Sequence, residues 1–459
     1  MKIPRWNIGI VGGGPGGLFT AYLLEQYHST PLNITIFEST NRLGGKLLTE
    51  RFSSSDIHYE AGAAEFYDYS VIDEDPLREL IEQFGLRTQS MGGASIVRGK
   101  TVLGTIEDAQ DNLGEVTLQE FLRFNNRAKS EVSPRQFYDS TSTSHINAWG
   151  TSLQDERFNH ALDQLANTTK NYIQQYIHSD LATEPSQTSH RYGLDNYLMN
   201  DPAYMQLYSI TGGNDLLIDA VACRLSADVR LNANVTAIKK GVGNTLELSW
   251  KATGGSKSEG FDAVVIALPI KPLKKLEFPD SDLASAMQSH IAHHDHPADY
   301  LRITILFEKP FWKSWLHDSY CMLDAFDGCC LYDESSRIPE ANHGVLGWLL
   351  GGAAAQKMAE YSDEELIPAA INSLPFQRDE AKELFREAKI HRWLGAVSAQ
   401  PGGFQQRQND AKHCPDIAAC PHLLVVGDYL FDSTLNGVLD SADYAAGWIT
   451  TMAAAQAQV

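Results

Sequence analysis

Six residues near the start of the chain, 12 to 17, consist of five glycines and a proline. Gly12, Gly14 and Gly17 satisfy the pattern G-x-G-x-x-G. In such a turn the first glycine permits a tight bend, the second lets the backbone approach a pyrophosphate, and the third lets a helix pack closely on a strand. The turn, which also contains Pro15 and Gly16, is therefore a candidate phosphate-binding loop at the positive end of a helix.

A carboxylate follows this turn at the spacing expected for ribose binding. Residues 34–37 read as a second strand that ends in Glu38, followed by Ser39. An acid roughly 20 residues after the last glycine accepts hydrogen bonds from the hydroxyl groups of an adenosine ribose. A glycine turn alone is weak evidence, but turn, helix, strand and acid in register indicate a dinucleotide-binding unit.

A second glycine pair lies a few residues further on, in Asn41-Arg42-Leu43-Gly44-Gly45-Lys46. Arg42 would supply a charge-assisted contact to phosphate, and Gly44 and Gly45 would let the backbone approach a cofactor. This segment resembles the R-x-G-G-[RK] motif of the flavin-containing amine oxidase superfamily, which includes monoamine oxidase and L-amino-acid oxidase-like proteins. In that family the motif, here ending in Lys46, runs beneath the FAD pyrophosphate, so the resemblance implies FAD.

Other pieces of the chain resemble the same family. Residues 60–66 are similar to its E-x-G-A segment beside the flavin, residues 211–217 to a helix start, residues 235–238 to its V-x-x-I strand ending and residues 262–269 to a closing strand. Residues 423–428 and 435–442 are similar to its C-terminal G-[DE] and G-A-x-x-S-G pattern. The helix near Gly437 would point its N-terminus at the flavin and stabilise negative charge on it. The cofactor-binding residues that the resemblance implies in these segments are Gly62, Ala63, Ala64, Val235, Gly427, Asp428, Asn436, Gly437 and Val438.

The resemblance also indicates which residues lie beside the reacting part of the flavin. The family usually carries a lysine on the strand before a Pro-Phe-Trp segment, and that position here is Arg302. Arginine keeps the positive charge but cannot be deprotonated, so the two residues are not interchangeable. The alternative for Arg302 is a strand arginine paired with a nearby acid.

Two further positions depart from the family pattern. Gly395 or Ser398, together with Thr434, stand where many members have a pair of tyrosines, and Trp393 is expected to substitute in part. Glu65 stands where amino-acid oxidases of the group have an arginine for a carboxylate. An acid there would suit a cationic substrate, unless Glu65 only bonds nearby backbone.

The mode of cofactor attachment follows from one more position. Covalent attachment in the family uses a cysteine beside the aromatic position, whereas this chain has Leu394 and Gly395 there. The resemblance therefore implies noncovalent FAD.

The leading hypothesis is an FAD-dependent oxidoreductase that oxidises the C–N bond of an amine or amino-acid-derived metabolite to an imine. The first alternative is a desaturase or isomerase of the same fold acting on C–C bonds. The second is a flavin-binding partner protein without turnover of its own.

The fold class expected is α/β, with a Rossmann-like FAD-binding domain assembled from separated segments and an inserted α+β substrate domain. We predict FAD-binding segments at 1–89, 206–275 and 411–459. The substrate domain should comprise 90–205 and 276–410. Residues 362–388 read as helices joined around Pro375.

Composition narrows the range of partners. Asp and Glu outnumber Lys and Arg by 58 to 37, and the net charge of −21 argues against nucleic acid. The longest apolar run, 344–355, is shorter than the roughly 20 residues that span a bilayer, so no integral membrane segment is expected. Six cysteines without a C-x-x-C pattern favour a reducing cytoplasm.

One histidine cluster could suggest a metal site. His290, His293 and His294 would share a helical face, with His296 close behind. A flavin enzyme needs no such metal, so we expect a solvated polar face and no metal.

Overall fold

Apolar side chains that alternate along the first strands produce a parallel sheet that is covered on both faces. The computed structural model describes residues 5–27, 32–70, 74–93, 95–138, 156–337, 342–400, 407–431 and 433–456. Every adjacent pair of strands in this five-stranded sheet is parallel. Its strands are, in spatial order, β10 (Asp228–Arg230), β2 (Leu32–Phe37), β1 (Trp6–Val11), β14 (Ala263–Ile266) and β20 (Leu423–Val425).

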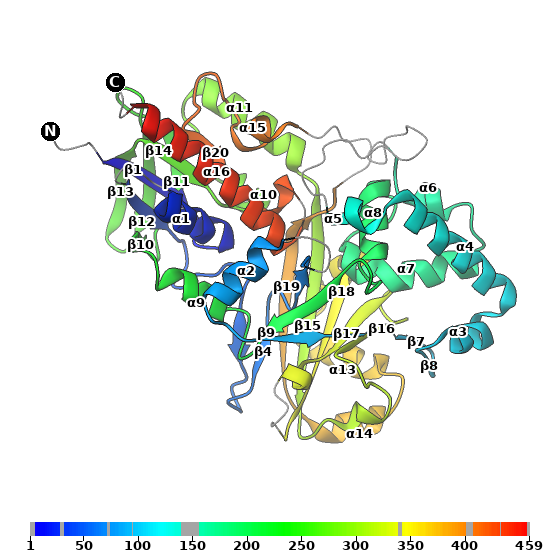
Figure 1. Ribbon diagram of the computed structural model, residues 1–459. Helices are drawn as coiled ribbons and strands as arrows, with labels where there is room; N and C mark the ends of the chain where they lie inside the picture. The colour runs from blue at the N-terminus through cyan, green and yellow to red at the C-terminus, as the bar shows by residue number, and fades with distance from the viewer. Residues whose placement is uncertain are drawn as a thin grey trace.

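The two faces of this sheet carry alternate residues of the same strands. Ile8 and Ile10 of β1 face α1 (Pro15–Tyr27), α9 (Leu216–Ala222) and α16 (Leu435–Gln456), whereas Val11 faces a three-stranded antiparallel sheet. That sheet consists of β11 (Asn234–Lys240), β12 (Leu246–Ala252) and β13 (Gly255–Phe261). Figure 1 shows this layered unit at the left of the molecule. The predicted Rossmann-like α/β unit is thereby confirmed.

A seven-stranded sheet forms the centre of the second half of the molecule. Its strands are, in order, β19 (Phe385–Ser398), β15 (Pro297–Phe307), β18 (Gly344–Gly351), β17 (Cys329–Asp333), β16 (Tyr320–Leu323), β7 (Ile96–Arg98) and β8 (Thr101–Leu103). Pairing of β15 with β19 places Tyr300 opposite Trp393. Arg302 and Trp393 therefore stand on neighbouring strands.

Two small sheets connect these units. One pairs β3 (Thr49–Arg51) with β4 (His58–Glu60), and the other has the order β5 (Phe66–Asp68), β9 (Gln206–Ile210), β6 (Thr88–Met91). The loop between β4 and β5, residues 61–65, contacts the large sheet, because Trp393 of β19 donates to Ala61 O and Tyr332 of β17 donates to Glu65.

Helices cover the remaining surfaces. A helical group at the right of Figure 1 packs around its own core and consists of α3 (Ile106–Leu113), α4 (Glu115–Glu131), α5 (Pro134–Tyr138), α6 (Asn159–Leu162), α7 (Asn167–Leu181) and α8 (His190–Leu198). The other helices are α2 (Pro76–Gln83), α10 (Ile270–Leu273), α11 (Ser281–His294), α12 (Gly352–Met358), α13 (Asp363–Ser373), α14 (Arg378–Leu384) and α15 (Asn409–His413). Short 3-10 helices are η1 (Phe311–Ser314), η2 (Glu334–Arg337) and η3 (Asp428–Leu430).

The helices predicted over 362–388 match α13 and α14, except that residues 385–388 belong to strand β19. Pairing with β15 explains the difference, since it is a long-range contact. Within the described ranges, no helix is long and apolar enough to cross a membrane.

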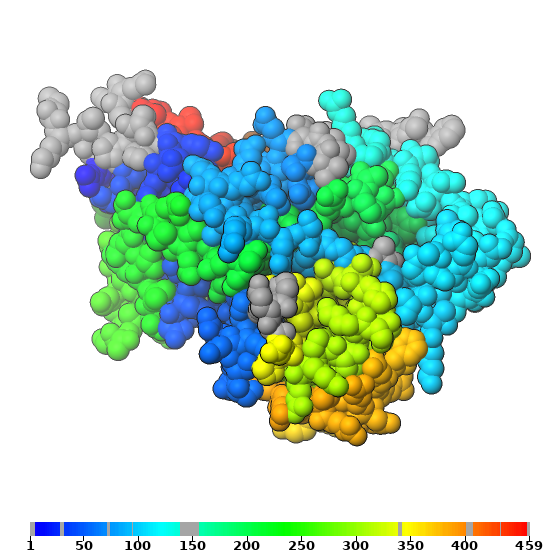
Figure 2. Space-filling view, turned by 60° about the horizontal axis from the view of Figure 1, so that its bottom comes forward, coloured from blue at the N-terminus to red at the C-terminus, as the bar shows by residue number. Residues whose placement is uncertain are grey.

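Segments that are distant in sequence lie side by side. Figure 2 shows N-terminal residues (blue) and middle residues (green) together at the left, with later residues (yellow and orange) beside the helical group (cyan). This arrangement is the discontinuous assembly that the sequence motifs predict. The exact segment boundaries stay a prediction.

Candidate active site

The glycine turn joins β1 to α1 in the conformation that the motif predicts. Gly12 has φ +114° and donates its N–H to Phe37 O at 2.8 Å. A Cβ on Gly17 would lie 2.0 Å from Gly12 O, so only glycine lets the helix approach this closely. At Gly14 a Cβ would meet no atom nearer than 3.7 Å. Gly45 Cα is thus the only described atom within 4 Å of that position, and the backbone of Gly14 is not crowded by side chains.

Glu38 follows β2 beside this turn. Its carboxylate accepts hydrogen bonds from the N–H groups of Gly13 at 2.9 Å and Thr40 at 2.8 Å, and from the hydroxyl of Ser39 at 3.3 Å. Its carbonyl accepts from Ala233 N at 2.8 Å, which brings the start of β11 and Val235 next to it. The predicted ribose-binding residues are thus neighbours in space.

The second glycine pair packs against the first turn. Gly44 N donates to Gly13 O at 2.8 Å, and Gly44 and Gly45 both have positive φ. The Arg42 guanidinium donates to the carbonyls of Leu43 at 3.1 Å and Gly45 at 2.8 Å. Arg42 therefore also holds its own loop in shape, a contact that the motif did not predict.

Lys46 joins the N-terminal glycine segment to Asp428, which lies near the C-terminus in sequence. Its Nζ donates to Asp428 Oδ2 at 2.6 Å and to Ala396 O at 2.5 Å. Gly427, before Asp428, donates its N–H to Ser441 Oγ at 3.1 Å. This ion pair lies between the glycine turns and the cavity described below.

The start of α16 completes the row of predicted cofactor-binding residues. Gly437 N and Val438 N bond the hydroxyl and carbonyl of Thr434 at 3.1 Å and 3.2 Å. Asn436 Nδ2 donates to Asp75 Oδ1 at 3.0 Å, whereas its buried Oδ1 finds no partner among the described residues. An uncrowded glycine backbone at one end and an unpartnered amide oxygen at the other fit a dinucleotide such as FAD.

A cavity of about 150 Å³ lies beyond Lys46. It brings together Glu65, Arg302 and Trp393, the three residues predicted for the reacting end. Trp393 is fixed because its Nε1 donates to Ala61 O at 2.7 Å. The remaining wall includes Lys46, Gly62, Ala63, Ala64, Tyr67, Tyr300, Leu349, Thr434 and Asn436.

A second cavity, of about 330 Å³, adjoins the first through Ala396 and Val397. Gly395 and Ser398 line this second cavity, whereas Thr434 lines the first. The positions that stand for the family's tyrosine pair thus line different cavities.

Arg302 belongs to a buried network of charged groups. It forms an ion pair with Glu334, and its guanidinium carbon lies 5.0 Å from the centre of the Tyr332 ring. Its Nε and Nη1 have no partner within the described residues. Arg302 therefore has the paired acid of the alternative interpretation and also forms part of the cavity wall.

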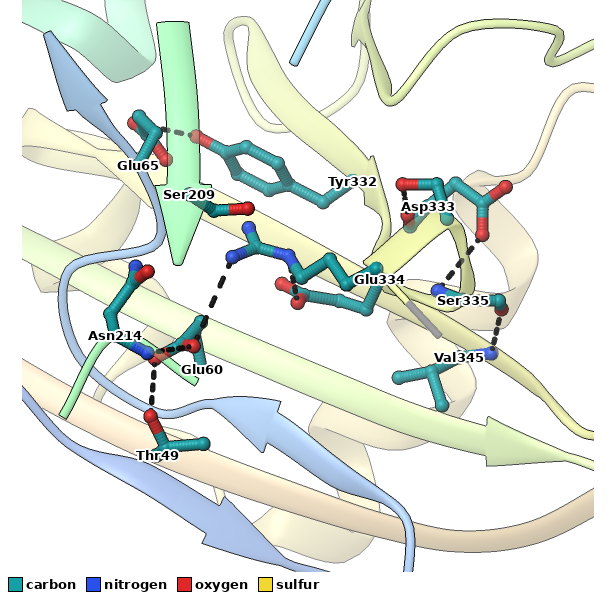
Figure 3. Close-up of polar contacts among 12 residues, drawn as sticks. Thr49, Glu60, Glu65, Ser209, Asn214, Tyr332, Asp333, Glu334, Ser335 and Val345 are labelled. Carbon is teal, nitrogen blue, oxygen red and sulfur yellow. Dashed lines mark hydrogen bonds and ion pairs between the residues drawn. The ribbon is translucent and has the colours of Figure 1, made fainter. Parts of the chain in front are cut away.

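Glu60, Glu65 and Arg337 extend this network. Arg337 lies 2.9 Å from Glu334 and 3.9 Å from Glu60. Figure 3 shows Glu60 between Thr49 and Asn214, and the Tyr332 hydroxyl directed at Glu65, to which it donates at 3.0 Å. Burial raises the pKa of Glu60 to about 7 and also raises the pKa of Glu65. Oε2 of Glu65 finds no partner in the described parts of the chain.

Residues 15–450 match the family model for flavin containing amine oxidoreductase. The chain belongs to this family. Its fold class is the one predicted from the motifs. Two similar solved structures carry the same fold. One is a wild-type putrescine oxidase bound to putrescine, 18% identical with a TM-score of 0.73, covering 98% of this chain and 99% of that one. The other is cyclohexylamine oxidase from Brevibacterium oxydans IH-35A, 16% identical with a TM-score of 0.72 over the same shares of the two chains.

A curated relative of this amine oxidoreductase is Aplysianin-A from Aplysia kurodai. It is 24% identical over 346 residues, which are 67% of this chain. The match spans 60% of the relative's own length.

One expectation about the oxidoreductase is wrong. His290 and His294 are buried and do not form a solvated face, because α11 packs this side against Tyr429, whose ring centre lies 5.4 Å from that of His294. Burial lowers the pKa of His290 to about 3, so its ring is neutral. Within the described residues, no group of three or more His, Cys, Asp or Glu side chains is placed to hold a metal.

Sequence reasoning missed several residues of the oxidoreductase's cavity and charged network. Tyr300 stands two residues before Arg302 on β15, so period-2 alternation alone would have placed both on one face. Tyr67 of β5 and Glu334, which directly follows β17, had no such signal, because the pairings of β5 with β9 and of β17 with β18 bring them to the site.

Proposed function

We propose that this oxidoreductase uses noncovalently bound FAD to oxidise the C–N bond of an amine or amino-acid-derived metabolite. FAD would accept the hydride that leaves the carbon, and hydrolysis of the resulting imine would release a carbonyl compound. The observation that carries the proposal is the continuous row of predicted residues from Gly14, past Lys46 and Asp428, to the cavity of Glu65, Arg302 and Trp393.

The cofactor would be held along this row. Glu38 would bind the ribose, the glycine turns would hold the pyrophosphate, and Asp428 would bind ribityl or ribose hydroxyls. The helix start at Gly437 would face the flavin. These assignments are supported by the uncrowded backbone at Gly14 and by the unpartnered Asn436 Oδ1.

Glu65 is suited to a cationic amine. Its Oε1 accepts from Tyr332, which leaves Oε2 to accept a hydrogen bond from an ammonium group. Burial raises the pKa of Glu65, and an ammonium group bound at this oxygen would favour the ionised carboxylate. Trp393 would form a rigid apolar wall beside the reacting carbon.

Arg302 would keep a permanent positive charge on the cavity wall. We propose that this charge influences flavin reduction or reoxidation, and that Glu334 and Tyr332 hold the guanidinium in place. An apolar isoprenoid in this cavity would leave Arg302 and Glu65 buried against hydrocarbon, which disfavours the C–C desaturase alternative.

The six cysteines form no disulfides, which supports the proposal that the protein works in the reducing cytoplasm.

The test is anaerobic bleaching of the flavin by a panel of amines and amino acids, followed by admission of air. Loss of the oxidised flavin spectrum with an amine, and release of the matching carbonyl compound, are expected. A flavin that no amine reduces, although dithionite reduces it, would contradict the proposal and favour a partner protein without turnover. Reoxidation by air distinguishes an oxidase from a dehydrogenase.

A further inference from the structure

The pairing of β15 with β19 is interrupted beside the two cavities. Asp299 of β15 faces three residues of β19, 394–396, because the register changes between Ala298 and Tyr300. At this point β19 therefore has two residues more than β15, and residues 394–396 form a bulge, called the β19 bulge below. Bulges are frequent beside active sites, where they change the direction of a strand and of its side chains.

The side chain of Asp299 holds the middle of the β19 bulge. Its Oδ1 accepts a hydrogen bond from Gly395 N at 2.6 Å, and its Oδ2 accepts one from Gln356 Nε2 of α12 at 2.6 Å. Gly395 has φ +69°, a left-handed conformation that favours glycine. The N–H of Asp299 donates to Ala182 O at 2.9 Å, directly after α7. Hydrogen bonds thus join Asp299 to β19, α12 and the end of α7.

Asp299 is a buried carboxylate that only neutral groups bond. Its exposed fraction is 7%, and in the described parts of the chain no basic side chain forms an ion pair with it. Burying a carboxylate without a cation costs stability even when the carboxylate accepts hydrogen bonds. A regular pair of strands would avoid this cost. The shape of the β19 bulge therefore has a use beyond the stability of the sheet.

The last residue of the β19 bulge, Ala396, contacts a predicted cofactor-binding residue. Its carbonyl accepts a hydrogen bond from Lys46 Nζ at 2.5 Å, and the same ammonium group pairs with Asp428 at 2.6 Å. Ala396 lines both cavities, whereas Lys46 lines the first and Asp299 the second. The β19 bulge therefore connects Asp299 with Lys46 across the wall that the two cavities share.

We propose that Asp299 is a positioning residue for FAD. This inference rests on the cofactor assignment of the proposed function. By accepting the Gly395 N–H, Asp299 fixes the Ala396 carbonyl, and this carbonyl holds the Lys46 ammonium group between the glycine turns and the first cavity. The binding path would thus be formed before FAD arrives, and less order would have to be created on binding. Asp299 itself would not touch the cofactor.

Two replacements separate the hydrogen bond of Asp299 from its charge. Asp299→Asn keeps an oxygen for the Gly395 N–H, and its amide can donate to Gln356 once the Gln356 amide has turned over. Asp299→Ala removes the acceptor. Asp299→Ala should weaken FAD binding at least ~10-fold and shift the visible absorption spectrum of the bound flavin, whereas Asp299→Asn should keep the parent's spectrum and stay within about threefold of its affinity. Spectra of the purified holoenzymes and fluorescence titration of the flavin-free proteins with FAD measure both.

Ser373→Ala is the matched control for a general loss of stability. It removes the hydrogen bond that Trp348 Nε1 of the same sheet donates to Ser373 Oγ at 3.0 Å, and neither residue lines a cavity. This variant should melt at a lower temperature and keep the parent's flavin spectrum. If Asp299→Ala does not fold, Gln356→Leu decides. It leaves Asp299 Oδ2 without its donor, so the carboxylate can turn away from Gly395, and a smaller change of the spectrum in the same direction is expected.

Parent-like affinity and spectrum in Asp299→Ala, or in Gln356→Leu where the first variant does not fold, would overturn the inference. So would an Asp299→Asn variant that behaves like Asp299→Ala, because charge and not position would then be responsible. A parent that binds no FAD would refute the cofactor assignment itself. A parent that binds FAD beside an unaltered Asp299→Ala variant would refute only the role of Asp299. No amine enters these measurements, so a failure of amine oxidation leaves their result unchanged.

Discussion

Arg302 carries a permanent charge on a side chain that is only 1% exposed, and its acid partner Glu334 is equally enclosed. Removing one member of a buried ion pair usually costs about 3–5 kcal/mol, because the other charge stays buried. Replacing both members together often costs little. Comparing the single with the double replacement therefore distinguishes a structural role of Arg302 from an effect of its charge on the flavin.

We therefore predict that Arg302→Met lowers the melting temperature by roughly 5 °C, whereas Arg302→Met with Glu334→Gln recovers only part of that loss, because Glu334 also pairs with Arg337. If the charge acts on the flavin, both variants should slow flavin reduction or reoxidation at least ~10-fold, about 1.4 kcal/mol. Stopped-flow traces of the two half-reactions, beside thermal melts, measure this. Half-reaction rates that recover together with stability in the double variant would show a structural role alone.

Glu60 gives a second prediction at the residue scale, on pH dependence. Its pKa is about 7 in the folded protein against 4.5 when unperturbed, so between these values the folded state binds the extra proton. The stability that this proton contributes is complete below pH 4.5 and is lost as pH rises through 7, by about 3 kcal/mol.

Glu60→Gln should accordingly gain stability relative to the parent as pH rises from 5 to 8. Denaturation of parent and variant at each pH gives the difference. Glu82→Gln, which removes an exposed carboxylate on α2, is the control and should run parallel to the parent. A constant difference between Glu60→Gln and the parent at every pH would mean that Glu60 is already ionised at pH 5.

At the scale of elements, Gly14 and Gly17 offer a matched pair within one turn. A Cβ on Gly17 would collide with Gly12 O, whereas a Cβ on Gly14 would only make an ordinary contact, 3.7 Å from Gly45 Cα. Gly17→Ala should therefore lower the melting temperature of the flavin-free protein. Gly14→Ala should leave that temperature within about 2 °C while weakening FAD binding at least ~10-fold, because the methyl group takes the space of the pyrophosphate. Fluorescence titration with FAD tests the second part, and unaltered FAD affinity in Gly14→Ala would place the pyrophosphate elsewhere.

The elements that could be predicted from sequence are those whose signals are local. The β1–α1–β2 unit, β14, β20 and the start of α16 each carry glycines, an acid or a buried apolar run at fixed spacing, so their positions follow from short segments. The cavity wall is different. Tyr67 and Glu334 reach the site through the pairings of β5 with β9 and of β17 with β18, which no local pattern specifies.

Helix α11 also has a feature that the sequence could not predict, the burial of its histidine face. The spacing of its histidines correctly places them on one face, but spacing cannot tell whether that face meets water or Tyr429. Burial is decided by what packs against a helix, and here a residue far along the chain does so.

At the scale of the whole molecule, neither cavity is lined by a cysteine among the described residues. We predict that the purified protein is yellow and that acid precipitation releases all of its flavin as FAD. The supernatant should contain FAD and the pellet should be colourless. Flavin retained in the pellet would indicate a covalent link, and a colourless protein that cannot be reconstituted with FAD would contradict the cofactor assignment.

The order of strands in the parallel sheet has a consequence for how the protein is made. β1 leaves the ribosome well before β14, with which it pairs, and β14 in turn leaves well before its partner β20 at residues 423–425. One edge of β1 therefore stays unpaired until β14 has been made, and one edge of β14 until β20 has been made. The cradle formed by the glycine turn, Asp428 and α16 cannot close until residue 437 has been translated. If FAD is held as we propose, its capture has to wait for residue 437, which is made more than 400 residues after the glycine turn.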